Sequence, residues 1–311
     1  MTKDNVSYSR IDDNIRLAQL VKNSIYRLTY HFFGQNEFVF VDPPILHEQI
    51  PNKKSEVYLS DLGNKYSLNS SNALYMAAYA SEFKRVFAIS PSFRNEQNSI
   101  NHLVEFRMLE VEVTNMSFDE MVEIVVNYLK YILCKIREEE YFKEYPLKQE
   151  RVKLLYKEFN PKVIPYKDFI NMIGKMSECI INENEAVDLS DIDYIVSRFV
   201  DKPIIIVDYP QKIASWTARQ KTKDYSYAMN MILPDGFGEL CEGCERTNNV
   251  DLLRYKMNCA KITNLQWYIE AVKRIDSKRC GFGIGIDRLV RWIVGCENIE
   301  ETVFFPRVKE G

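Results

Sequence analysis

The sequence predicts a fold that mixes α-helices with β-strands, and three patterns carry this prediction. Before residue 35, apolar side chains recur at the spacing of a helix. At 93–96 and 104–113, residues alternate with period two, as in strands that bury one face. The run PIIIVDYP at 203–210 is β-branched and ends in proline, which is typical of a buried strand. With 311 residues, 46% of them hydrophobic, the chain can bury a large core.

The first predicted helix comes just before a short strand. The helix has one apolar side, formed by Leu17, Val21, Ile25, Leu28 and Phe32. Gly34 suits the end of this helix. Pro43 and Pro44 stop the strand predicted at 38–41, because proline has no N–H group to donate to a sheet.

A second amphipathic helix follows a capping box formed by Ser117 and Glu120. Its apolar stripe consists of Met121, Val125, Tyr128, Ile132 and Ile136. From about 140 to 200 the chain is charged and helical in pattern, so we expect an insertion subdomain within a single domain of residues 1–311. Another strand is predicted at 227–234, before the turn PDGFGE.

Composition and charge narrow the class of protein. No apolar run approaches the ~20 residues of a membrane span, and the first residues lack the apolar core of a signal peptide. We therefore expect a cytoplasmic protein without a membrane partner. The net charge of −3 argues weakly against binding to a phosphate backbone.

The seven cysteines are an odd number and indicate reduced thiols. Cys241 and Cys244 form a CxxC pair that only Cys259 and Cys280 could complete, so packing is favoured over structural zinc.

Two segments contain most of the candidate site residues. In FRNEQNSINHLVEFRMLEVEV at 93–113, alternation places Arg94 and Glu96 on one face. Phe106, Met108 and Glu110 share the corresponding face of the returning strand. That surface combines a cation, an aromatic ring and two acids.

The second segment is GFGIGIDRLVRW at 281–292. Gly281, Gly283 and Gly285 leave one strand face without side chains, so a flat ligand can lie against the backbone. Arg288 follows at the start of an apolar helix and offers a fork of donors to phosphate oxygens. The glycines alone would favour a weakened strand, and their spacing does not fit a dinucleotide fingerprint. Together the two segments predict one ATP site.

These segments resemble motifs 2 and 3 of the class II aminoacyl-tRNA synthetases, in the aspartyl/asparaginyl branch. VFVDPPIL at 39–46 is similar to motif 1, with Pro44 at its proline, and FFPR at 304–307 resembles the closing sequence. The resemblance runs from about 16 to 307. It implies an α+β fold, with a mostly antiparallel sheet flanked by helices, and a homodimer formed through the first helix and strand.

The resemblance also implies a role for each matching residue at the nucleotide. Arg94 would grip the α-phosphate and the substrate carboxylate, and Arg288 the γ-phosphate. Phe106 would stack on adenine. The other expected nucleotide contacts are Glu96 at the adenine end, His102 at the terminal phosphate, and Gly283 and Gly285 on the open strand.

Glu239 matches the carboxylate that binds catalytic Mg²⁺ in the family, a hard cation that prefers oxygen ligands. The catalytic set implied is thus Arg94, Glu239 and Arg288. The usual acidic companion of Glu239 aligns with Asn230, which has a carbonyl oxygen but no charge, so the number of metal ions stays open.

The amino-acid pocket resembles the family's pocket but departs from it. Arg246 matches the arginine that reads a side-chain carboxylate or amide, and Glu110 the acid that holds the α-amino group. The selectivity wall NSSNALYM at 69–76 contributes Ser70, Asn72 and Tyr75. Asn72 stands at a glutamine position and Tyr75 at the position of a lysine, and loss of that cation disfavours a second carboxylate. Asn101 replaces the arginine that usually precedes His102.

The family's tRNA ligases carry a barrel of roughly a hundred residues before motif 1. Because motif 1 begins close to residue 1 here, we expect no anticodon-binding domain. The favoured hypothesis is an ATP- and Mg²⁺-dependent ligase, similar to stand-alone asparagine synthetases. It would activate an aspartate- or asparagine-like acid as acyl-AMP and transfer it to ammonia or another amine. The alternative is a truncated asparaginyl- or aspartyl-tRNA synthetase that transfers to tRNA or a carrier, and a non-catalytic regulator is least favoured.

Overall fold

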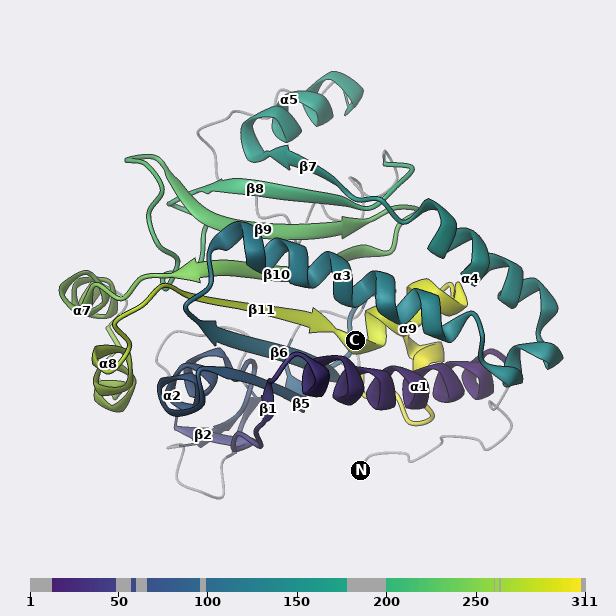
Figure 1. Ribbon diagram of the computed structural model, residues 1–311, viewed down its shortest axis with the longest axis horizontal. Helices are drawn as coiled ribbons and strands as arrows, with labels where there is room; N and C mark the ends of the chain where they lie inside the picture. Colours follow the sequence, from purple (N-terminus) through teal and green to yellow (C-terminus); the bar gives the residue numbers. More distant parts are fainter. Residues whose placement is uncertain are drawn as a thin grey trace.

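The computed structural model describes residues 13–48, 57–59, 66–95, 99–177, 200–259, 261–262 and 264–308. Its centre is an eight-stranded sheet, and a separate three-stranded sheet lies beside it (Figure 1). Across the large sheet the strands are, in order, β1 (Val39–Phe40), β5 (Arg85–Phe93), β6 (Glu105–Thr114), β11 (Arg279–Gly285), β10 (Gly238–Arg246), β9 (Tyr225–Leu233), β8 (Ile204–Pro210) and β7 (Lys162–Pro165). Only the two edge pairs, β1 with β5 and β7 with β8, are parallel among these described strands. The small sheet consists of β2 (Leu46–Glu48), β4 (Tyr66–Leu68) and β3 (Val57–Tyr58).

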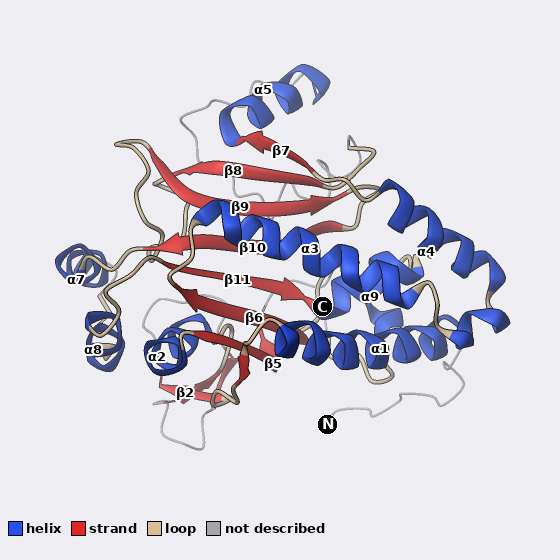
Figure 2. Ribbon diagram, viewed as in Figure 1, coloured by secondary structure: helices blue, strands red, loops and turns tan. Residues whose placement is uncertain are grey.

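Helices flank the large sheet, so the predicted α+β class with a mostly antiparallel sheet is confirmed (Figure 2). The helices are α1 (Asp13–Gln35), α2 (Ala73–Phe83), α3 (Phe118–Ile136), η3 (Glu140–Glu144), α4 (Pro146–Glu158), α5 (Tyr166–Ser177), α7 (Val250–Cys259), α8 (Gln266–Lys273), α9 (Ile286–Val294) and η4 (Ile299–Thr302). Figure 1 shows α1 and α3 lying across one face of the sheet, while α7 and α8 lie at the end where β10 finishes and β11 begins. Among the helices that the structure describes, none combines the length and apolarity needed to cross a membrane.

Both strongly periodic helices form where the sequence predicts them. On α1, the predicted residues other than Phe32 are buried, and Phe32 packs against the core. This helix ends at Gln35, and the left-handed residue that follows is Glu37, with φ of 62°, rather than Gly34. On α3 the capping box is present, since the Ser117 hydroxyl accepts from the Glu120 N–H while the Glu120 carboxylate accepts from the Ser117 N–H. All five residues of its predicted stripe are buried.

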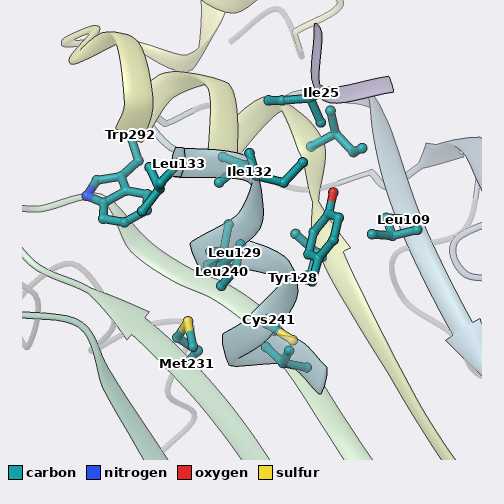
Figure 3. Packing of buried hydrophobic residues seen from close by; sticks show 14 of the residues in the cluster. Ile25, Leu109, Tyr128, Leu129, Ile132, Leu133, Met231, Leu240, Cys241 and Trp292 are labelled. Atoms are coloured by element: carbon teal, nitrogen blue, oxygen red, sulfur yellow. The ribbon is translucent and has the colours of Figure 1, made fainter. Parts of the chain in front are cut away.

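One face of the sheet forms the main core together with α1, α3 and α9. Side chains such as Leu109 of β6, Cys241 of β10 and Met231 of β9 pack there beneath Tyr128 and Leu129 of α3 (Figure 3). Burying a leucine-sized side chain contributes about 1.5–3 kcal/mol, so this face accounts for much of the fold's stability. Because strand side chains alternate, the neighbouring residues on each strand face the other side. On that opposite face, α2 packs against β5 and α5 packs against β8.

The structure changes two details of the prediction. The first strand of the 93–113 segment runs through 85–93, so Arg94 lies just beyond its end instead of within it. Glu96 lies outside the described residues. Between 140 and 200, the short strand β7 extends the sheet beside β8, where only helices were expected. The insertion subdomain stays a prediction, because 178–199 also lies outside the described residues.

Candidate active site

A cavity of about 280 Å³ opens on the face of the sheet that the main helices leave uncovered. Its walls include many of the residues predicted from the sequence: Arg94, His102, Phe106, Glu110, Glu239, Arg246, Gly283, Gly285 and Arg288. They come from segments up to 194 positions apart, since Arg94 and Arg288 line the same space. The two segments therefore meet at one cavity, as the predicted ATP site requires.

Strand register explains why these residues meet. Glu110 of β6 pairs with Gly283 of β11, and Gly283 pairs on its other side with Glu242 of β10. Paired residues share a sheet face, so a bare glycine lies between two acidic side chains. A β-bulge between Glu239 and Cys241 shifts the register by one residue. This shift brings Glu239 onto the same face as Glu242, although plain alternation would separate them.

Arg94 and Phe106 form one wall of this cavity. The Arg94 guanidinium carbon lies 5.3 Å from the centre of the Phe106 ring, a distance typical of a cation–π contact. The Arg94 Nε also donates to the carbonyl of Ser70 at 3.3 Å. The cation is therefore held beside an aromatic face, both half-buried and both lining the cavity.

Arg288 lines the same cavity from the first turn of α9. Its guanidinium donates to the carbonyl oxygens of Glu239 and of Asn101, the latter at 3.1 Å. Asn101 is buried, and its side-chain oxygen accepts a hydrogen bond from Arg291. Carbonyl oxygens orient a guanidinium without neutralising it, and the fork of donors on Arg288 suits phosphate oxygens.

The start of α9 is fixed by Asp287, which the sequence analysis did not single out. Asp287 is buried, forms an ion pair with Lys22 of α1, and accepts a hydrogen bond from the Arg107 N–H at 2.7 Å. A buried carboxylate satisfied on both oxygens holds its element firmly. Asp287 thereby ties α9, and with it Arg288, to α1 and β6.

His102 follows a short bridge and lines the same cavity. Its Nδ1 lies 2.6 Å from the Ser99 hydroxyl, which orients the ring. The expected contact of His102 with a terminal phosphate stays a prediction.

Glu239 lines the cavity, and its carboxylate accepts a hydrogen bond from the side-chain amide of Asn230. Among the residues that the structure describes, no three His, Cys, Asp or Glu side chains gather into a metal cluster. Mg²⁺ commonly takes one or two carboxylates and completes its shell with water and substrate phosphates. The Glu239 carboxylate with the neighbouring Asn230 amide fits that kind of site and does not form an all-protein cage.

Arg246 lies at the inner end of the cavity in a buried polar network. Its guanidinium contacts Glu112 at 3.4 Å and Thr217 at 3.0 Å. The other oxygen of Glu112 accepts from Arg279 at 2.7 Å, and Arg279 also contacts the Tyr268 hydroxyl at 3.2 Å. The network fixes the Arg246 guanidinium in place. Sequence reasoning missed Glu112, although it alternates with Glu110 on the same strand face.

Gly281 makes this network possible. A Cβ atom at this position would lie 1.8 Å from a Glu112 carboxylate oxygen and 2.8 Å from the Arg246 guanidinium. The glycine is needed for the close approach of these two side chains, whereas the sequence analysis expected a flat ligand against the bare strand.

Glu110 is buried, and its carboxylate accepts from the Asn72 N–H at 2.8 Å and the Ser71 hydroxyl at 2.7 Å. Burial raises the pKa of Glu110, and these hydrogen bonds oppose that rise. Ser71, which the sequence analysis did not single out, lines the cavity next to it.

The residues of the predicted selectivity wall differ in whether they line a cavity. The Asn72 side-chain amide donates a hydrogen bond to the Ser90 hydroxyl at 2.7 Å, and its oxygen lies 3.0 Å from the His47 Nε2. Ser70 and Asn72 are not among the described residues that line either the first cavity or a neighbouring one, whereas Tyr75 lines the neighbouring cavity.

The CxxC pair has no metal-site geometry. Cys241 packs into the main core while Cys244 belongs to another cluster on the other side of β10. Burial raises the pKa of both thiols, which keeps them neutral. Packing is thus the role that the described structure supports.

Comparison with known proteins places this site in a family. Residues 8–309 match the family described as tRNA synthetases class II (D, K and N). The asparagine–tRNA ligase of Lactobacillus gasseri is 29% identical over 296 residues, covering 93% of this chain and 68% of that protein. The asparagine–tRNA ligase of Mycoplasmopsis pulmonis is 28% identical over 317 residues, covering 95% and 70%.

A solved structure shares the fold. The asparaginyl-tRNA synthetase of Pyrococcus horikoshii, complexed with asparaginyl-adenylate, matches with a TM-score of 0.85 at 23% identity, over 95% of this chain and 69% of that chain.

These relatives correct the favoured functional hypothesis. The expectation of a tRNA-independent amide synthetase is wrong, because both curated relatives are named asparagine–tRNA ligases. The family resemblance itself is confirmed, and the match extends over nearly the whole chain. The chain belongs to the class II tRNA synthetases of the D, K and N group.

Proposed function

We propose that this protein is an ATP-dependent ligase that activates asparagine, or a close analogue, as aminoacyl-AMP and transfers the aminoacyl group to tRNA. One observation carries the proposal: Arg94, Phe106 and Arg288 share a cavity with Glu110 and Arg246. Groups suited to a nucleotide and groups suited to an amino acid thus line one space.

The first step joins the amino acid to ATP. A carboxylate oxygen attacks the α-phosphorus, the bond to the bridging oxygen breaks, and pyrophosphate leaves with its electron pair. Because two anions approach each other, catalysis requires neutralised charge and an in-line geometry rather than a nucleophilic side chain. Arg94 can bridge the α-phosphate and the carboxylate, while Arg288 across the cavity can hold the departing phosphates.

The ring of Phe106 supports adenine binding. It lines the cavity beside the Arg94 guanidinium and presents a half-buried face. An adenine stacked there would have its triphosphate directed along the bare strand at Gly283 and Gly285. Mg²⁺ held by Glu239, with the oxygen of Asn230 as a further ligand, would supply additional positive charge beside the phosphates.

Glu110 and Arg246 support an amino-acid substrate. The Glu110 carboxylate can hold an α-ammonium group, and Arg246 donates hydrogen bonds to a side-chain oxygen. Tyr75 stands at the position of a lysine, and the loss of that cation favours a neutral amide over a carboxylate. The names of both curated relatives agree with asparagine.

In the second step, a terminal hydroxyl of tRNA attacks the carbonyl carbon of the aminoacyl-AMP. The ester bond forms as the mixed anhydride breaks, and AMP leaves with its electron pair and takes up the proton of the hydroxyl. The relatives named asparagine–tRNA ligase support tRNA as the acceptor.

We further infer a homodimer through α1 and β1. Three apolar side chains remain 40–45% exposed there: Tyr30, Val39 and Phe40. The rings of Tyr30 and Phe40 lie 5.0 Å apart, and β1 is the outermost strand of the sheet. An exposed apolar patch at a sheet edge is typical of a protein interface.

Asparagine-dependent exchange of pyrophosphate into ATP tests adenylate formation, with aspartate as the comparison substrate. Charging of total tRNA with labelled asparagine tests the transfer step. We expect exchange with asparagine and a labelled tRNA product. Exchange without any charged tRNA would contradict the transfer step, and no exchange with either amino acid would contradict the whole proposal.

A further inference from the structure

A second cavity, of about 570 Å³, adjoins the candidate active site. The two cavities share part of their walls, namely Ser71, Ala73, Ser215, Glu242 and Arg246. The junction is therefore at Arg246, the residue proposed to bind the end of the substrate's side chain. The space beyond this residue has twice the volume of the first cavity.

Aromatic rings line this second cavity. His47, Tyr75 and Trp267 form a row, with centroids 4.5 Å apart for the first pair and 4.7 Å for the second. The neighbouring planes are tilted by 38° and 32°. Trp216 and Tyr268 form a second aromatic pair in the same wall, 5.8 Å apart. Such walls recognise flat apolar groups by stacking and edge contacts.

The rings are held in place before any ligand arrives. The His47 Nε2 contacts both the Pro44 carbonyl at 2.9 Å and the Asn72 side-chain oxygen at 3.0 Å. Trp267 lies in the first turn of α8 and packs against a buried apolar cluster. Since these side chains are already ordered, a ligand that stacks on them loses little entropy in ordering the wall.

The aromatic part of the cavity favours a neutral ligand group. Charged side chains also line the cavity: Arg246 and Arg279 share the buried Glu112 carboxylate, Glu242 lies in the wall common to both cavities, and Glu48 and Lys261 are exposed. A group stacked on the rings of Tyr75 and Trp267 would instead face apolar surfaces, where an ionised group loses its water without gaining a charged partner from those rings.

An unmodified asparagine does not use this space. Its carboxamide is the last group of the side chain, so contact with Arg246 would leave the aromatic cavity unfilled. An asparagine that carries a substituent on the amide nitrogen would reach past the junction, with its carbonyl oxygen still available to Arg246.

We propose that the amino acid activated here is an asparagine derivative whose side-chain amide bears a planar, apolar substituent, which stacks in the second cavity against Tyr75 and Trp267. This inference rests on the proposed adenylate-forming function and specifies the class of its substrate.

Pyrophosphate exchange with N4-benzyl-L-asparagine, compared with L-asparagine, tests the proposal. We expect kcat/KM for the benzyl derivative to exceed that for asparagine by roughly tenfold, which is the scale of one buried ring with aromatic contacts. Trp267→Ala should lower the ratio of the two kcat/KM values at least about fivefold, and Trp267→Phe should largely retain it. Tyr255→Ala is a matched control, because Tyr255 is 66% exposed on α7 and is not among the described residues lining either cavity.

A second variant covers the case in which Trp267→Ala fails to fold, which a thermal melt would reveal. Ile213 lines only the second of the two cavities, so Ile213→Trp should fill that space and lower the same ratio. A preference for asparagine, unchanged in these variants, would overturn the inference while leaving the proposed function intact. Loss of tRNA charging alone in Trp267→Ala would also overturn it, by assigning the cavity to the acceptor. Exchange with neither compound nor aspartate would overturn the inference together with the proposed function.

Discussion

Replacing Gly281 by alanine places a methyl group where the Glu112 and Arg246 side chains approach the backbone most closely. The new Cβ would lie 1.8 Å from one oxygen of Glu112 and 2.8 Å from the guanidinium of Arg246. Gly281 is not among the described glycines with positive φ, so alanine meets no backbone strain there. The perturbation therefore acts through the Glu112 carboxylate and its partners.

The size of the effect follows from how Glu112 is held. Glu112 is 0% exposed, and its carboxylate accepts from Arg279 at 2.7 Å and contacts Arg246 at 3.4 Å. To clear a methyl group, the nearer oxygen must move by more than about 1 Å, which breaks the weaker contact. Overpacking a core costs about 1–3 kcal/mol, and a lost hydrogen bond to a charged group adds about 1.5 kcal/mol. We expect the free energy of unfolding to fall by about 3 kcal/mol.

Urea unfolding and thermal melting measure this change, and the melting temperature should fall by roughly 6–12 °C. Because Arg246 loses its position, kcat/KM for the amino acid in pyrophosphate exchange should also fall at least about tenfold. Gly285→Ala is the matched control for stability, since its Cβ would meet only the Arg288 Cβ, at 3.6 Å. A melting temperature for Gly281→Ala within about 2 °C of the wild type would refute the reasoning.

Four further predictions concern Arg94, the proposed dimer interface, Glu110 and the cysteines. Arg94→Ala should lower pyrophosphate exchange about 10²–10³-fold with an unchanged melting temperature, and unimpaired turnover would contradict its role. Phe40→Glu should convert a dimer into a monomer in sedimentation, whereas Leu147→Glu, at a residue 85% exposed on α4, should not; a wild-type monomer would contradict the interface. Burial raises the pKa of Glu110 above 4.5, so its contribution to the free energy of unfolding should fall as the pH rises from 4.5 through the folded-state pKa. Glu110→Gln should remove this slope, and an identical pH profile would contradict the shift. Exposed Cys259 should be alkylated before the buried thiols of β10, and the reverse order would contradict their burial.

Periodicity predicted the elements whose side chains divide clearly between core and solvent. The stripe on α3 and its Ser117 capping box follow from spacing alone, because burial and capping are local requirements. The extent of β5 was harder to predict, because its buried positions include Ser90 and Ser92, whose polar side chains give no hydrophobic alternation in the sequence. Local reasoning also missed β7, which pairs in parallel with a strand some 40 residues later.

The site residues within the two segments that resemble the family could be predicted from the sequence. The contacts that depend on how distant segments pack together could not. Arg94, Phe106 and Arg288 meet as expected, although nothing in their spacing brings them together. Arg279 reaches Glu112 across 167 positions, and a β-bulge turns Glu239 to the site face; neither has a local signal in the sequence.

The functional hypothesis shows where such reasoning stops. The preference for an amine acceptor depended on the net charge of −3 and on the expectation of no anticodon-binding domain, rather than on a group that binds the acceptor. Adenylate chemistry is common to both alternatives, so the residues around Arg94 cannot choose between them. The curated relatives decide against the tRNA-independent reaction.

A crystal structure with a non-hydrolysable asparaginyl-adenylate analogue, such as the sulfamoyl adenosine, tests the central claim most directly. We predict that adenine stacks on Phe106, that the sulfamoyl group contacts Arg94, and that the side-chain amide reaches Arg246. An analogue bound away from the bare strand at Gly283, or one that contacts neither arginine, would contradict the account.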